Sequence, residues 1–453
     1  MAEIDDLSFE TDNVVAAKDA EDKIFDSSNA VVSFVSERFK RAEDARQGDE
    51  ERWLRAYRNY RGLYGPDVQF TETEKSRVFV KVTKTKTLAA YGQIIDVLFG
   101  NNKFPLSVDP TVLPDGVSES VHINIDPAAE EGFDVLKSTF NDSPAEPFII
   151  GPDTKLNPGE TLRDLEQRLG PLKEKLAPIS DKLIEGDGES STTVTFHPAM
   201  IAAKKMEKKI HDQLVESGAS KHLRSMAFEM ALLGTGVMKG PFALDKEYPN
   251  WDEEGDYEPL VKTVPATNHV SVWNFYPDPE SSSMDNAEYT VERHKMSRNQ
   301  LRTLKNRPYF MADSIETAID KGADYQLKHW EMNMEDDDAK HNATERWEVL
   351  EFWGFVDIDI LEDNGVSIPK ELRDLPEVNC NIWCCNGEVL RMVLNPFKPA
   401  RIPYYAVPYE HNPYSFFGVG IAENMDDTQT LMNGFMRMAI DNAALSGNLI
   451  IEV

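Results

Sequence analysis

Apolar residues recur at helical spacing in the N-terminal part and in the middle of the chain. Between residues 30 and 64 this spacing predicts two amphipathic helices, which break near Gly48 and end at Gly62. Residues 200–233 predict a pair of helices that breaks at Gly218, because apolar positions repeat every three to four residues on both sides of this glycine. A large part of the chain is therefore expected to be helical.

Alternating apolar and polar residues predict strands, mostly in the second half of the chain. Two such runs, 379–385 and 388–394, flank Asn386-Gly387, which predicts a hairpin with a tight turn. Further strands are predicted for the start of 77–99 (before a helix), Tyr289–His294, Trp347–Phe355 and Val356–Leu361. Helices and strands together predict an α+β fold with a β-rich segment at 340–410.

The last helix, from Ile421 to about Leu445, is apolar around most of its circumference. Its large apolar side chains, which we expect to pack against other helices, are Leu431, Met432, Phe435, Met436, Met438 and Ile440. A polar stripe remains at a spacing of four residues: Gln429, Asn433, Arg437 and Asp441. A helix that is apolar nearly all round is normally buried. The stripe therefore predicts one face that meets a channel, a neighbouring subunit or water, and an ordinary buried helix is the alternative.

Changes in composition divide the chain into six parts. These are an acidic flexible N-terminus (1–30), N-terminal helices (31–104), a Pro- and Gly-rich, loop-rich insertion (105–200), an α+β region (201–417), the long last helix (418–447) and a short strand start (448–453). Within the insertion, residues 161–176 predict a single helix. Because a strand that has just begun needs a partner, we expect the native product to continue past Val453.

The acidic composition argues against a protein that grips nucleic acid. The chain has 79 acidic and 48 basic side chains, a formal net charge of −31. Affinity for phosphate comes from Lys and Arg, so a sequence-specific DNA binder or a nuclease should show a dominant basic patch. If DNA is a partner, we expect a surface that does not hold it; the alternative is that the acidity only favours solubility.

Candidate chemistry is sparse in this sequence. The three cysteines, Cys380, Cys384 and Cys385, lack the spaced pairs of a structural zinc site and predict small buried thiols in a strand. The run Gly234–Gly240 lacks the spacing of a phosphate-binding loop and predicts a helix end that leads into a strand. The acidic tract 335–338 is typical of a solvated loop. We therefore predict no catalytic residue, no metal and no cofactor, and no apolar run is long enough for a membrane span.

The order of several motifs resembles a known family. These motifs are Gly-Thr-Gly-Val-Met-Lys at 234–239, Asn-Phe-Tyr-Pro-Asp-Pro at 274–279, Glu-Arg-His-Lys-Met-Ser at 292–297, Pro-Tyr-Tyr at 403–405, and Gly-Val-Gly-Ile-Ala-Glu at 418–423 leading into Asp427, Gln429 and Asn433. In this order they resemble the portal, or head-to-tail connector, proteins of short-tailed, podovirus-like double-stranded DNA phages. The resemblance covers roughly residues 30–100 and 200–453.

The resemblance implies a non-enzymatic ring of twelve copies around a DNA channel at one capsid vertex. It assigns 31–417 to the wing, 418–447 to the first stem helix and 448–453 to the start of the clip. It also implies that the protein assembles in the host cytoplasm, becomes part of the virion, and serves genome packaging, head–tail joining and ejection. The implied partners are the terminase motor, head–tail adaptor or tail proteins, major capsid and scaffold proteins, and double-stranded DNA, which is contacted without sequence specificity. The alternatives are another virion structural protein, such as an adaptor or internal virion protein, and a packaging nuclease or ATPase.

Overall fold

The computed structural model describes the chain in two compact units. Described residues are 30–66, 68–72, 74–100, 104–110, 121–125, 184–185, 192–196, 198–251, 256–334 and 345–447. One unit combines Met1–Asn102 with Leu214–Val453, and the other is Lys103–Gln213. Both helices and sheets are present, which confirms the α+β class. The segment 1–29, the helix expected at 161–176, the acidic tract 335–338 and the strand expected at 448–453 lie outside the described residues.

The unit Lys103–Gln213 contains a small antiparallel sheet. Its strands are β1 (Val121–Ile125), β2 (Ile184–Glu185) and β3 (Thr192–Phe196), and β3 lies between the other two. The sequence predicted loops here, because frequent Pro and Gly interrupt the alternation from which strands are recognised. The longer helix α7 (Pro198–Glu216) follows the sheet in the chain.

The helices of the larger unit largely match the predicted ones. A helix over residues 30–45 is followed by α2 (Gln47–Arg61), and the break lies at Arg46 instead of Gly48. The buried guanidinium of Arg46 donates hydrogen bonds to the carbonyl oxygens of Val272, Trp273 and Phe275, which fixes the turn in place. Gly62 ends α2 with a positive φ of 81°, a conformation that glycine adopts at little cost.

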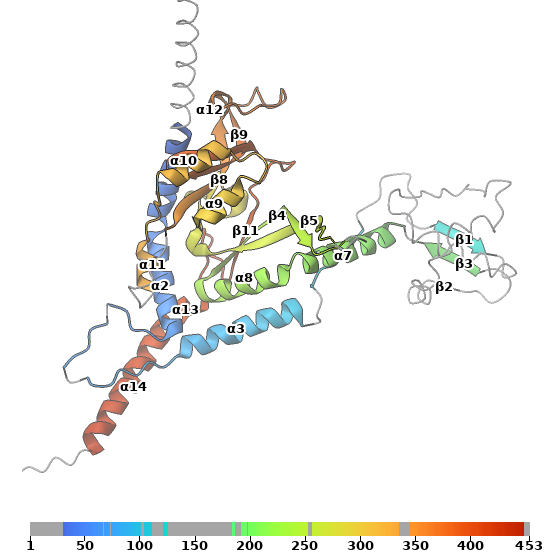
Figure 1. Cartoon of the computed structure of the whole chain (residues 1–453). Helices are drawn as coiled ribbons and strands as arrows, with labels where there is room; N and C mark the ends of the chain where they lie inside the picture. The colour runs from blue at the N-terminus through green and yellow to red at the C-terminus, as the bar shows by residue number, and fades with distance from the viewer. Residues whose placement is uncertain are drawn as a thin grey trace, which may run out of the picture. The chain divides into compact units, whose positions relative to one another are not determined.

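Helices and a three-stranded sheet form successive layers of this unit. Helix α3 (Val82–Phe99) packs on α8 (Ala219–Leu233), and α8 packs on β4 (Thr235–Tyr248) and β5 (Leu260–Val270), as Figure 1 shows. Strand β11 (Tyr404–Pro408) completes the sheet in the order β11-β4-β5. The predicted break between α7 and α8 at Gly218, and the predicted helix end at Gly234, are both confirmed.

A second sheet is antiparallel and has five strands in the order β10-β9-β8-β7-β6. The strands are β6 (Phe275–Pro277), β7 (Tyr289–Met296), β8 (Trp347–Asp357), β9 (Glu377–Cys385) and β10 (Glu388–Leu394). The predicted hairpin is confirmed, because β9 and β10 join at Asn386 and Gly387, both with positive φ. The predicted strand Val356–Leu361 is wrong: β8 ends at Asp357 and α12 (Ile358–Asp363) follows, since Ile358 and Leu361, three residues apart, both turn inward.

Both faces of the five-stranded sheet are covered. One face packs on the helix over 30–45, and the other on α9 (Arg298–Leu304) and α10 (Ala312–Asp320). Cys380 and Cys384 lie in the first of these clusters and Cys385 in the second, which confirms three buried free thiols on opposite faces. The remaining helical elements are η1 (Val272–Asn274), η2 (Met284–Asn286), α11 (His329–Met334), α13 (Ile421–Asn424) and α14 (Asp426–Gly447). No described helix combines the length and apolar content that crossing a membrane requires.

Candidate assembly site on the last helix

The predicted last helix is present, with one interruption. A short helix, α13, ends at Asn424, and after Met425 α14 continues for 22 residues with Asp426 and Asp427 in its first turn. Carboxylates at a helix N-terminus are stabilised by the helix dipole. Basic residues of α2 add to this: Arg52 binds Glu423 at 2.7 Å and Arg55 binds Asp426 at 3.4 Å. Arginines of α2 therefore hold the start of this helix.

The upper half of the polar stripe binds another part of the same chain. Gln429 is 1% exposed and Asn433 is 5% exposed. The side-chain oxygen of Gln429 accepts hydrogen bonds from the backbone N–H and the hydroxyl of Thr83, both at 3.0 Å. The side-chain oxygen of Asn433 accepts the backbone N–H of Val80 at 2.9 Å, and the amide of Gln429 donates to the carbonyl of Val80.

The lower half of the stripe meets the same segment. Asp441 accepts the backbone N–H of Ser76 at 3.0 Å. The guanidinium carbon of Arg437 lies 5.2 Å from the ring centre of Tyr64 and 5.1 Å from that of Phe70. All four stripe residues thus contact residues 64–83 of their own chain, and we call this contact the polar seam.

The polar seam explains two local features of the chain. Helix α3 has no side-chain cap of its own, because Lys81 precedes it, and Gln429 supplies the missing acceptor for the N–H of Thr83. The strand expected at the start of 77–99 does not form in the described residues 74–81, because backbone groups there bond to side chains of α14. Helical spacing located the stripe but does not reveal what covers it, and a contact of the stripe with a channel or a neighbour stays a prediction.

The predicted packing residues of α14 are exposed in the single chain; Leu431, Met432, Phe435 and Met438 lie on the half opposite the polar seam, whereas Met436 and Ile440 lie closer to it. Their exposed fractions are 59% for Leu431, 39% for Met432, 58% for Phe435, 39% for Met436, 53% for Met438 and 37% for Ile440. At about 100° per residue most of them fall opposite the polar seam, and we call them the apolar arc. A contiguous apolar patch with a polar border marks a site of interaction.

A buried charge cluster, which the sequence analysis missed, connects the two sheets. The Lys239 ammonium lies 2.8 Å from Glu292 and also binds Glu351, while Tyr404 donates to Glu292 at 2.6 Å and His294 contacts Glu351 at 2.9 Å. Burial opposes the charge on Glu351, but Lys239 and His294 hold its pKa well below the usual range. Burial likewise opposes the charge on Lys239, and the two carboxylates raise its pKa above the ordinary value.

The same cluster is a candidate metal site by composition. Ligand atoms of Glu292, His294 and Glu351 lie within 4.8 Å of one another. The Lys239 ammonium lies between the two carboxylates, and it already provides the positive charge that a metal ion would bring. The arrangement is therefore that of a structural ion-pair network.

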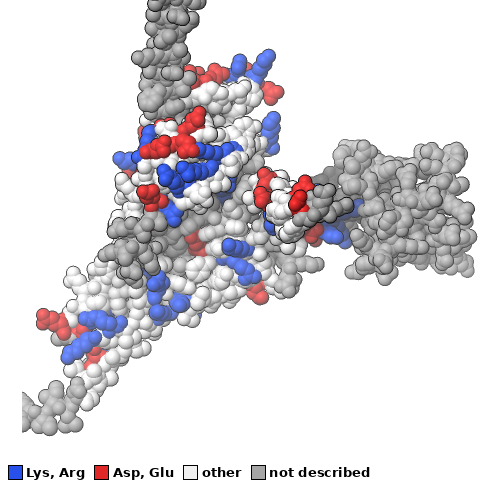
Figure 2. Space-filling model, viewed as in Figure 1, with Lys and Arg blue, Asp and Glu red and all other residues white. Residues whose placement is uncertain are grey.

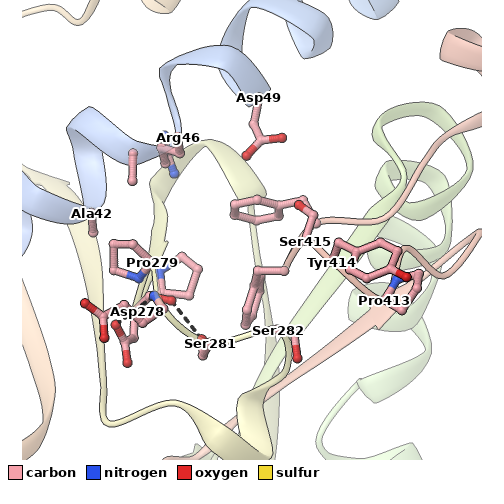
Figure 3. A pocket seen from close by; sticks show the side chains of 15 residues that line it. Ala42, Arg46, Asp49, Asp278, Pro279, Ser281, Ser282, Pro413, Tyr414 and Ser415 are labelled. Carbon is pink, nitrogen blue, oxygen red and sulfur yellow. Dashed lines mark hydrogen bonds between the residues drawn. The ribbon is translucent and has the colours of Figure 1, made fainter.

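A cavity of about 240 Å³ lies beside the turn between the first helix and α2 (Figure 3). It is lined by Ala42, Ala45, Arg46, Asp49, Pro277, Asp278, Pro279, Glu280, Ser281, Ser282, Pro413, Tyr414, Ser415, Phe416 and Phe417. Ser281 donates to the carbonyl oxygen of Asp278 at 2.8 Å. No histidine, cysteine or lysine is among these lining residues, and Asp278 is the only one of them to which a hydrogen bond from a serine hydroxyl of the cavity is seen.

One comparison with known proteins identifies a family. The model of the family described as "Phage SU10 portal protein" matches residues 197–451, more than half of the 453 residues. The matched part begins next to α7 and includes both larger sheets and the whole of α14. No curated protein matches the chain.

Proposed function

The chain belongs to the phage SU10 portal protein family, and from this membership we propose that it is a subunit of a ring-shaped DNA channel at one capsid vertex. Portal proteins are structural components of the virion, so the role does not require catalytic chemistry. The observation that carries the proposal is the division of α14 into a buried polar seam and an exposed apolar arc.

The apolar arc is suited to contacts between identical subunits. In a ring each subunit presents one surface to the next, and the contacts close by rotation. Fully burying a side chain such as Leu, Phe or Met contributes about 1.5–3 kcal/mol, so each half-exposed member of the arc would gain about 1 kcal/mol from a neighbouring copy. The gain is repeated at each interface of the ring, for which we propose twelve subunits.

The proposal extends to the parts of the chain and their partners. Residues 31–417 would form the wing, with 105–200 as an insertion, and 418–447 the first stem helix, with 448–453 leading into the clip. The ring would serve genome packaging with the terminase motor, head–tail joining with adaptor and tail proteins, and ejection. Capsid and scaffold proteins would surround it, and double-stranded DNA would pass through it without sequence specificity.

The test is the assembly state of the full-length protein and of two matched variants. Leu431→Glu places a charge on the apolar arc, whereas Leu375→Glu makes the same change at a similarly exposed residue, 48% against 59%, away from α14. Mass photometry and negative-stain images should show rings for the native protein and for Leu375→Glu, and single chains for Leu431→Glu. A native protein without rings, or a Leu431→Glu variant that assembles normally, contradicts the proposal.

A further inference from the structure

A basic stretch lies beside α14 in this otherwise acidic chain. Between Lys75 and Lys86 the sequence has five basic residues and no acidic one, although the whole chain carries −31. Together with the end of α2 this gives six exposed basic side chains, which we call the basic segment: Arg61, Lys75, Arg77, Lys81, Lys84 and Lys86. Net charge alone predicts a chain that does not hold DNA, but the charge is unevenly distributed.

Within the described part of the chain, the side chains of the basic segment form no ion pair with a carboxylate. No carboxylate of the described residues pairs with any of the six, although acidic residues outnumber basic ones across the chain. Elsewhere in the same unit exposed bases do have carboxylate partners, for example Lys262 with Glu216 and Lys321 with Glu388. The basic segment is therefore a surface of uncompensated positive charge.

Two members of the basic segment, Lys81 and Lys84, lie at the junction of α2 and α3. The Lys81 side chain packs against Gly62, with its Cε close to the position that a Cβ would occupy there. The Lys84 ammonium lies 5.7 Å from the ring centre of Tyr60 on α2. Figure 2 shows several Lys and Arg side chains, with some acidic ones beside them, on this lower part of the unit, where α2, α3 and α14 meet in Figure 1.

A second, independent observation in the same place is the state of Arg437. Its Nε and one Nη are buried and have no hydrogen-bond partner. Arg437 shares the ring of Phe70 with Arg77, whose guanidinium carbon lies 4.0 Å from the ring centre. Two cations close to one ring repel each other, and unsatisfied buried donors are costly. An anion bound at the exposed Arg77 would offset this repulsion.

We propose that the basic segment, with Arg437, binds the phosphate backbone of duplex DNA. Arginine and lysine side chains are the groups that contact DNA phosphates, and such contacts need no base recognition. An interface with an acidic protein would have an apolar centre, and Val78 is the only large apolar side chain that is exposed in the described part of 61–86. The inference rests on the proposed function, since a ring would repeat this surface around the DNA.

Binding of a short fluorescent duplex to the full chain, followed by anisotropy over a range of salt concentrations, tests the inference. The variant Lys81→Gln/Lys84→Gln/Lys86→Gln removes three charges from the basic segment. The control Lys204→Gln/Lys208→Gln/Lys209→Gln removes three exposed charges from α7. For each phosphate that the variant no longer binds, affinity near 0.1 M salt should fall by roughly an order of magnitude, and the salt slope by about 0.9. The control should bind like the native protein.

Ring assembly of all three proteins, measured in parallel, separates this inference from the proposed function. If rings of the basic-segment variant bind DNA as well as rings of the control do, or if rings of the native protein bind no DNA, the inference is overturned and the proposed function stays intact. The same holds if the basic segment binds an acidic polyglutamate peptide in preference to the duplex. The absence of rings in the native protein overturns the proposed function instead.

Discussion

The five-stranded sheet and α14 differ in which of their side chains, apolar or polar, are buried and paired within the chain. The sheet buries both of its faces against helices of its own chain. Its buried charges are also paired inside the chain: Arg293 binds Glu348, and Lys239 binds Glu292 and Glu351. In α14 Gln429, Asn433 and Asp441 form hydrogen bonds within the chain while large apolar side chains are exposed, which reverses the usual arrangement.

The contrast separates the surfaces that a single chain buries by itself from the surface that it leaves exposed for another molecule. The sheet covers both of its faces and pairs Arg293 and Lys239 within its own chain, so most of its buried groups need no other molecule. A helix that leaves six large apolar side chains at 37–59% exposure retains free energy that contact with another molecule can release. Changes in the sheet should therefore alter the stability of a single chain, whereas changes in the apolar arc should alter assembly.

The largest effect is expected from breaking the charge cluster inside the sheet. Glu351→Gln leaves the buried ammonium of Lys239 with one carboxylate instead of two. Removing one partner of a buried ion pair costs about 3–5 kcal/mol. Urea unfolding of the assembly-deficient Leu431→Glu protein should show this loss, with Lys262→Gln, which removes an exposed pair, as a nearly silent control. If Glu351→Gln and Lys262→Gln lower the free energy of unfolding equally, the buried charge cluster does not contribute more than an exposed ion pair.

Acid should weaken the same cluster to a smaller extent. Because the pKa of Glu351 is lower in the folded chain than its ordinary value of 4.5, its contribution is complete above that pH and decreases as pH falls below it. One group changes the free energy of unfolding by at most about 1.4 kcal/mol per pH unit. Melting temperatures between neutral pH and pH about 3 should fall less steeply for Glu351→Gln than for the parent protein. If melting temperature falls equally steeply with pH in both proteins, the charge of Glu351 does not stabilise the folded chain.

Breaking the polar seam should have a moderate and local effect. Gln429→Ala removes the acceptor that caps α3, and loss of a cap costs about 0.5–2 kcal/mol. Hydrogen exchange should become faster in residues 80–87, while the five-stranded sheet stays protected. Thr430→Ala, one residue further along α14 and exposed, is the control. Unchanged exchange at the start of α3 would show that the seam does not hold this helix.

The sequence predicted those features that depend on neighbouring positions along the chain. Spacing along the chain located α14 and its polar stripe, and the Asn386-Gly387 pair located the hairpin. It failed where the partner is distant. Lys239 and Glu351 lie 112 residues apart, and no local pattern connects them.

Two wrong predictions have the same physical origin. The alternation in 77–81 is typical of a strand, but its backbone groups bond to side chains of α14, about 350 residues away in the chain. The short apolar run at 356–361 fits a strand or one helical turn equally well, and the contacts of Ile358 and Leu361 with the core decide for the turn. Tertiary contacts overrule local preference wherever a run is short.

The smallest expected effect tests α14 at the border between its two halves. Gly434 is in the middle of the helix, and no atom lies within 4 Å of a Cβ added there. Gly434→Ala should therefore stabilise the single chain by up to about 1 kcal/mol, because alanine has the higher helix propensity. Thermal unfolding in the Leu431→Glu background measures this gain without contributions from assembly. If the same substitution weakens rings of the otherwise native protein, a neighbouring copy must approach α14 closely at Gly434, which would place the subunit contact at the edge of the apolar arc.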